Sequence, residues 1–108
     1  MPNFNDFVDM FKNDLLDFAR ENLEEYKNEL IKDGSQFVEK AKTDLERWTE
    51  GLASGALNKE DFEFLLKAKK DLAEMEALKL SGLAQIKIDK LTNGIIDVIV
   101  GSAIKTFI

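Results

Sequence analysis

The first half of the chain carries large apolar side chains at a spacing of eleven residues. One column of this repeat consists of Phe4, Leu15, Tyr26, Phe37 and Trp48. A second column, equally regular, consists of Val8, Ala19, Leu30, Ala41 and Leu52. Eleven residues correspond to three turns of a nearly straight α-helix, so both columns lie along one side of it, which we call the seam. Polar residues occupy the opposite side, and the pattern therefore predicts an amphipathic helix over residues 3–50.

A glycine interrupts this pattern at Gly34, where Asp33-Gly34-Ser35 could end one helix and begin the next. The seam nevertheless keeps its phase from Tyr26 to Phe37, across the glycine. We therefore expect one long helix that bends near Gly34. A turn at Gly34, which would divide it into two helices, stays open as the alternative. At 1.5 Å per residue this helix would measure roughly 70 Å, too long for a compact monomer.

The clearest break in the chain is the segment GLASG, which starts at Gly51 and predicts a loop over residues 51–57. A second helix is expected over residues 58–92. Asn58 is a suitable N-cap for it, and the acidic residues that follow suit the positive end of a helix dipole. A kink is expected in this helix at Ser81-Gly82.

A further break is expected at Thr92-Asn93-Gly94, followed by an apolar C-terminal helix over residues 95–107. Only Asp97 and Lys105 are charged in this last segment. Two interpretations of it stay open. It forms a buried layer of an oligomer, or it lies at a bilayer surface as an amphipathic helix.

These elements predict an all-α fold made of a single helical unit over residues 1–108. The simplest architecture is a long antiparallel helical hairpin with the eleven-residue repeat in its first arm. Because a two-helix hairpin buries only a narrow seam, we expect it to assemble into a helical bundle as a homo-oligomer.

The composition removes most catalytic and metal chemistry. The chain contains no histidine and no cysteine, so thiol nucleophiles, histidine bases and the usual zinc ligands are absent. No phosphate-binding glycine motif is present. An acidic row with i, i+4 spacing, from Asp17 to Asp33, is most simply a solvated helix face. We therefore expect no enzyme, no catalytic residue, no cofactor and no metal.

The net charge of −6 argues against nucleic-acid binding, which depends on lysine and arginine contacts to phosphate. The second half contains more lysines, which could pair with the acidic first half or touch acidic lipid. The N-terminal residues lack a basic leader with an apolar segment, and the longest late uncharged stretch, Val98 to Ile104, is far shorter than a membrane span. A cytoplasmic protein is expected.

The predicted function is a non-enzymatic module for helical self-association or protein interaction, with a further protein partner as an option. The predicted interface consists of Phe4, Val8, Leu15, Tyr26, Leu30, Phe37, Trp48, Leu52, Ile95, Ile99, Ile104 and Phe107. The alternative is an amphipathic membrane-surface or pore-forming protein that acts through its apolar C-terminal segment. A third hypothesis is an adaptor whose acidic face over residues 14–33 meets a basic partner.

Overall fold

Helices account for most of the computed structural model, which describes residues 2–108 and contains no strand within that range. The α-helices are α1 (Phe4–Asn22), α2 (Lys27–Lys40), α3 (Lys42–Ser54), α4 (Lys59–Ala68), α5 (Glu76–Leu80) and α6 (Gln85–Phe107). Two short 3-10 helices, η1 (Glu24–Tyr26) and η2 (Lys70–Leu72), lie between them. The all-α fold class is confirmed.

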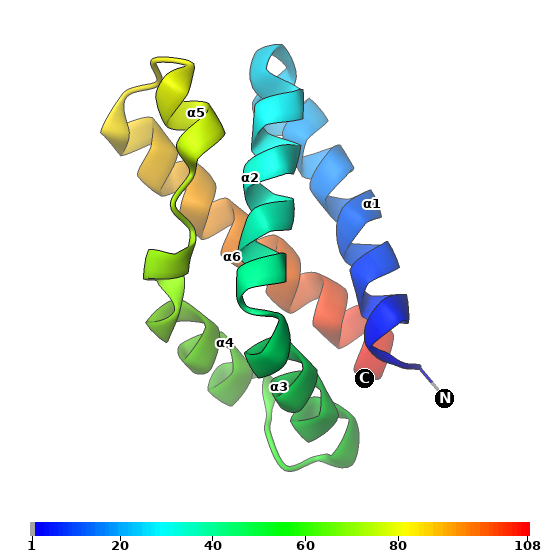
Figure 1. Ribbon diagram of the computed structural model, residues 1–108. Helices are drawn as coiled ribbons and strands as arrows, with labels where there is room; N and C mark the ends of the chain where they lie inside the picture. Colours follow the sequence, from blue (N-terminus) through cyan, green and yellow to red (C-terminus); the bar gives the residue numbers. More distant parts are fainter. Residues whose placement is uncertain (1) are drawn as a thin grey trace.

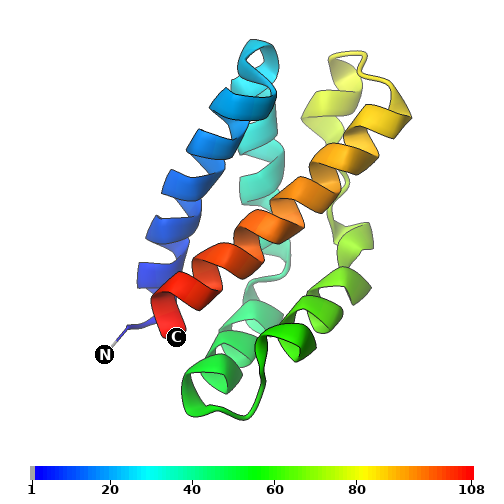
Figure 2. The same cartoon turned by 180° about the vertical axis from the view of Figure 1, so that it is seen from behind.

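The chain reverses its direction at residues 23–26, 55–58 and 81–84, and α6 then crosses the layer formed by the other helices (Figure 1). Figure 2 shows the same crossing from behind, with the end of α6 beside the start of α1. Helix α6 packs against α1, α3, α4 and α5. The resulting body measures 42 × 24 × 19 Å, so it is much shorter than the expected long hairpin.

The central position of α6 explains its apolar composition. Its buried apolar side chains are Ile88, Leu91, Ile95, Ile96, Ile99, Val100 and Ala103. A helix that is covered on several sides needs apolar residues around most of its circumference. The apolar C-terminal segment is therefore core of the chain itself in this structure.

Every member of the two columns of the seam is buried or half-buried within this one chain. The single helix expected over residues 3–50 is wrong. Helix α1 ends at Asn22, Leu23 leaves the helical conformation with φ −156° and ψ 55°, and α2 runs back beside α1. A smaller interruption at Ala41 separates α2 from α3. Folding back buries the seam within one chain, which a 70 Å helix could not do.

The turn considered at Gly34 does not occur, since α2 continues through this residue from Lys27 to Lys40. Gly34 is buried where α2 meets α1. A Cβ atom on Gly34 would lie 2.8 Å from Leu15 Cδ2, closer than carbon atoms normally approach. The glycine therefore allows two helices to pack closely, and it does not end either of them.

The expected helix over residues 58–92 is also wrong, because α4, η2 and α5 occupy this range together with the first turns of α6. Met75 precedes α5 in a left-handed conformation, with φ 54°. The predicted kink at Ser81-Gly82 is a full reversal of the chain, with φ 85° at Gly82. Gly82 marks the last of these breaks in the local sequence, whereas the breaks between α4 and α5 depend on where the short helices pack.

The expected break at residues 92–94 is absent, and α6 runs from Gln85 through the predicted 95–107 helix. Thr92 lies inside α6, where its buried hydroxyl donates to the carbonyl of Ile88 at 2.9 Å. Gly94 lies where α6 passes Phe18, and a Cβ atom there would lie 2.3 Å from the ring. The glycine again serves close packing between helices.

The loop expected over residues 51–57 starts later, because α3 continues to Ser54 and ends at Gly55 with φ 83°. Glycine adopts this left-handed conformation without steric cost. The predicted N-cap at Asn58 is confirmed. Asn58 Oδ1 accepts from the amide of Asp61 at 2.8 Å, and the amide of Asn58 donates to Asp61 Oδ2 at 3.2 Å.

A buried carboxylate joins the two halves of the fold. Asp33 on α2 is only 3% exposed, and its two oxygens accept from the amides of Ala77 and Leu78 at 3.0 and 2.9 Å. Helix α5 has no side-chain cap of its own, so Asp33 satisfies its first amides from another helix. The predicted solvated acidic face is therefore wrong for Asp33, because its helix is covered by α5 at this point.

Replacing Asp33 by alanine is expected to lower the free energy of unfolding by about 3 kcal/mol, because two buried amides lose a charged acceptor. Urea unfolding followed by circular dichroism measures this loss. Asp9→Ala, which removes an exposed carboxylate from α1, is the matched control and should change stability by less than about 0.5 kcal/mol. Equal unfolding midpoints for the two variants would show that the Asp33 contacts contribute nothing.

Candidate interaction surfaces

The residues predicted as an interface lie largely inside this one chain. Those that are buried are Leu15, Leu30, Phe37, Trp48, Leu52, Ile95 and Ile99. Those that are half-buried against the core are Phe4, Val8, Tyr26, Ile104 and Phe107. A second copy can therefore reach the buried members only where a helix separates from its own core.

The structure brings the first and the last of these residues together at one end of the molecule. The ring of Phe7 lies 5.5 Å from that of Phe4 and 6.4 Å from that of Phe107, measured between centroids. Phe11 continues the row, with its ring centroid 6.3 Å from that of Phe7. This aromatic contact joins the start of α1 to the end of α6.

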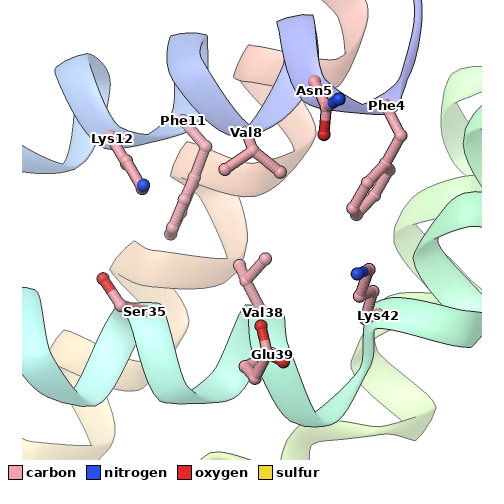
Figure 3. Close-up of a pocket in the computed structure, with 9 residues that line it drawn as sticks. All are labelled: Phe4, Asn5, Val8, Phe11, Lys12, Ser35, Val38, Glu39 and Lys42. Carbon is pink, nitrogen blue, oxygen red and sulfur yellow. The ribbon is translucent and has the colours of Figure 1, made fainter.

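A groove of about 300 Å³ runs between α1 and α2 (Figure 3). Its apolar lining consists of Phe4, Val8, Phe11 and Val38, and its polar lining consists of Asn5, Lys12, Ser35, Glu39 and Lys42. Figure 3 shows the apolar side chains of the two helices facing one another across it. The groove offers apolar contact and two lysine amino groups. Its one hydroxyl belongs to Ser35, and within the range that the structure describes this hydroxyl has no hydrogen bond to a side chain that could take up its proton.

One polar cluster combines a carboxylate, a hydroxyl and an amine. Ser102 Oγ lies 2.8 Å from Asp14 Oδ2, and Lys105 Nζ lies 3.2 Å from the same oxygen. Ser102 is fully buried, and its hydroxyl can donate instead to the carbonyl of Val98 at 2.8 Å. The cluster therefore links α1 to α6, with the Ser102 hydroxyl buried and with Asp14 and Lys105 reaching solvent. No local sequence signal predicts it, because its members come from opposite ends of the chain.

Ion pairing at the surface shifts a few pKa values. The hydrogen bond and the charge of Lys67, 2.9 Å away, lower the pKa of Glu63, and the same contact raises the pKa of Lys67. A hydrogen bond from Lys40, 3.0 Å away, lowers the pKa of Glu74. All of these groups reach solvent, so their contacts guide helix placement more than they stabilise it.

The turn between α5 and α6 exposes two large apolar side chains. Leu80 is 90% exposed and Ile86 is 73% exposed, although most large apolar side chains are buried. Exposed Lys79, Lys87 and Lys90 accompany them. We call these five residues the α5–α6 tip. Leu80 is the last residue of α5, and the turn that follows leaves its side chain in solvent.

Ile86 and two of the tip lysines also line a second groove, between α1 and α6, with a volume of about 390 Å³. Phe18 and Leu91 form its apolar part, and Gly94 lies at its edge. The tip is therefore continuous with an apolar recess along α6.

The part of the chain that the structure describes contains no group of three or more histidine, cysteine, aspartate or glutamate side chains placed to hold a metal ion. Between residues 2 and 108, no helix combines the length and apolar character needed to cross a bilayer. Comparisons with protein-family models, curated proteins and solved structures found no match to this chain.

The two glycines of α6 should respond differently to alanine. Gly101→Ala is expected to raise the free energy of unfolding by about 0.5–1 kcal/mol, because nothing lies within 4 Å of the new methyl group. Gly94→Ala should gain less or lose stability, because the Phe18 ring must move. Thermal unfolding compares the two variants, and adding Phe18→Ala to both should reduce their difference. A Gly94→Ala protein more stable than Gly101→Ala would contradict the packing described.

Proposed function

We propose that this chain is a non-enzymatic helical module that acts by associating with a second copy of itself. The observation that carries this proposal is the phase of the seam. The eleven-residue columns continue in register from α1 through α2 into α3, across the helix ends at Asn22 and Lys40.

When a chain turns back between two helices, the apolar stripe of the second helix need not keep the eleven-residue spacing of the first. Packing along one continuous helix, in contrast, does require that the spacing continue unbroken. The large side chains of the seam, with Leu15, Phe37 and Trp48 as examples, suit helix packing better than contact with water. This combination supports self-association through apolar helix faces.

Sedimentation equilibrium tests the proposal directly. We expect the average mass to rise from that of one chain towards twice that value as the protein concentration increases. The double variant Leu80→Ser/Ile86→Ser should show the same increase in average mass as the parent protein, because these exposed residues lie outside the seam columns. If the mass stays that of one chain at every concentration, the chain does not self-associate and the proposed function fails.

A membrane-surface role is the second candidate, and the α5–α6 tip favours it. Exposed leucine and isoleucine side chains beside lysines are the combination that binds anionic bilayer surfaces. The apolar C-terminal segment is a less direct candidate for this contact, because α6 would have to leave the core before Ile95 and Ile99 could meet lipid. The tip residues need no such rearrangement.

Vesicle flotation tests this second candidate. The protein should float with vesicles rich in anionic lipid at low salt, and less with neutral vesicles, because the lysines contribute a screened attraction. Leu80→Ser/Ile86→Ser should abolish flotation, whereas Phe64→Ser, at a side chain 74% exposed on α4, should not. Protein that stays at the bottom with both vesicle types removes the membrane candidate.

A further inference from the structure

The three reversals of the chain are built differently. Those at residues 55–58 and 81–84 each contain a glycine with positive φ, Gly55 and Gly82. The first is followed by the capping box at Asn58 as well. The reversal at residues 23–26 has no glycine, no proline and no residue with positive φ. Only this reversal lacks local residues that require the chain to turn.

The residues of this turn favour a helix when considered alone. Leu23, Glu24 and Glu25 are among the stronger helix formers. Helix α2 begins without a side-chain cap, so no side-chain hydrogen bond marks its start. Three local contacts are present at the turn. Asn22 Nδ2 donates to the carbonyl of Phe18 at 2.9 Å, the amide of Tyr26 donates to the carbonyl of Leu23 at 3.1 Å, and Lys27 Nζ lies 4.0 Å from Glu24 Oε1. Contacts of these kinds each contribute little net stability. The turn is therefore held mainly by the packing of α1 and α2, including burial of Leu23.

Helix α1 packs chiefly against α2 and α6. Specific contacts hold it there: Leu15 against Gly34, Phe18 against Gly94, and Asp14 with Ser102. All of these contacts join α1 to residues beyond the turn. They could therefore form equally well with α2 and α6 of another copy, provided that the turn opened.

We infer that two copies of this chain exchange α1. Residues 23–26 become helical, α1 and α2 join in one helix, and each α1 packs on α2 and α6 of the other chain. The contacts that α1 makes within one chain form again between the two chains, and only residues 23–26, the hinge, change conformation. Exchange is therefore a low-cost route to a symmetric dimer. Leu15, Tyr26 and Phe37 then follow one continuous stripe, which accounts for their common phase. The inference rests on the proposed self-association and specifies its interface.

A proline in the hinge tests the exchange. Glu24 is the first residue of η1, a position where proline is tolerated, whereas proline inside a fused helix would remove a hydrogen bond and clash with the preceding turn. We expect Glu24→Pro to weaken dimerisation roughly a hundredfold or more in sedimentation equilibrium. Glu24→Ala removes the same carboxylate without blocking the helix, so this matched control should dimerise as the parent does.

Circular dichroism establishes that both variants fold. If Glu24→Pro does not fold, Glu24→Gly combined with Glu25→Gly tests the same step, because glycine disfavours the fused helix without restricting φ.

A disulfide formed between two different chains locates the exchanged helix. The chain has no cysteine, so Asp14→Cys in one preparation and Ser102→Cys in another introduce one thiol each. The two preparations are mixed at a concentration that favours dimers and are then oxidised. A disulfide between Cys side chains of the two different chains should then give a covalent heterodimer. The same mixture carrying Glu24→Pro should not. Lys105→Cys, at a more exposed neighbour of Asp14, replaces Ser102→Cys if the buried substitution prevents folding.

The outcomes separate the two proposals. A mass of one chain at all concentrations overturns both self-association and exchange. A dimer that survives Glu24→Pro and gives no covalent heterodimer overturns exchange and leaves self-association standing. A dimer that is lost with Glu24→Pro, retained with Glu24→Ala and trapped by the mixed thiols supports both.

Discussion

The rest of the structure depends on covering α6. This helix of 23 residues is apolar around most of its circumference, and water would contact that surface unless other helices lay against it. Helices α1, α3, α4 and α5 all pack on it, so the chain must reverse direction often enough to bring them there. The shorter helices that precede α6 achieve this, whereas two long arms would leave most of α6 exposed.

A few polar contacts determine how the covering helices are placed. Asp33 fixes α5 to α2 through two buried amides, and Asp14 fixes α1 to α6 through Ser102 and Lys105. In residues 2–108 every buried side-chain nitrogen and oxygen has a hydrogen-bond partner. Because an unsatisfied buried group would cost stability, these contacts favour one arrangement among several with similar apolar burial.

The candidate surfaces follow from the same folding. Ending α5 at Leu80 exposes the apolar tip, and turning the chain at residues 23–26 divides a seam that is continuous in sequence. The tip is accessible in the folded chain, whereas the seam becomes available to a second copy only when α1 leaves its place. A lipid surface and a second copy would therefore use different parts of this molecule, and variants of one part should leave the other unaffected.

By itself, the sequence determined that the chain is helical and which side of each seam helix is apolar. Both properties depend on local periodicity, which Phe4, Leu15, Phe37 and Trp48 display directly, and Asn58 likewise marks a helix start through a local hydrogen bond. Only the tertiary structure decided where the helices end and which residues stay exposed. Leu23 turns without a local breaker, Gly34 and Gly94 sit inside helices, and Asp33 caps a helix more than forty residues away. An apolar stripe has the same pattern whether its partner is the same chain or another one, so periodicity cannot distinguish a folded hairpin from an extended seam.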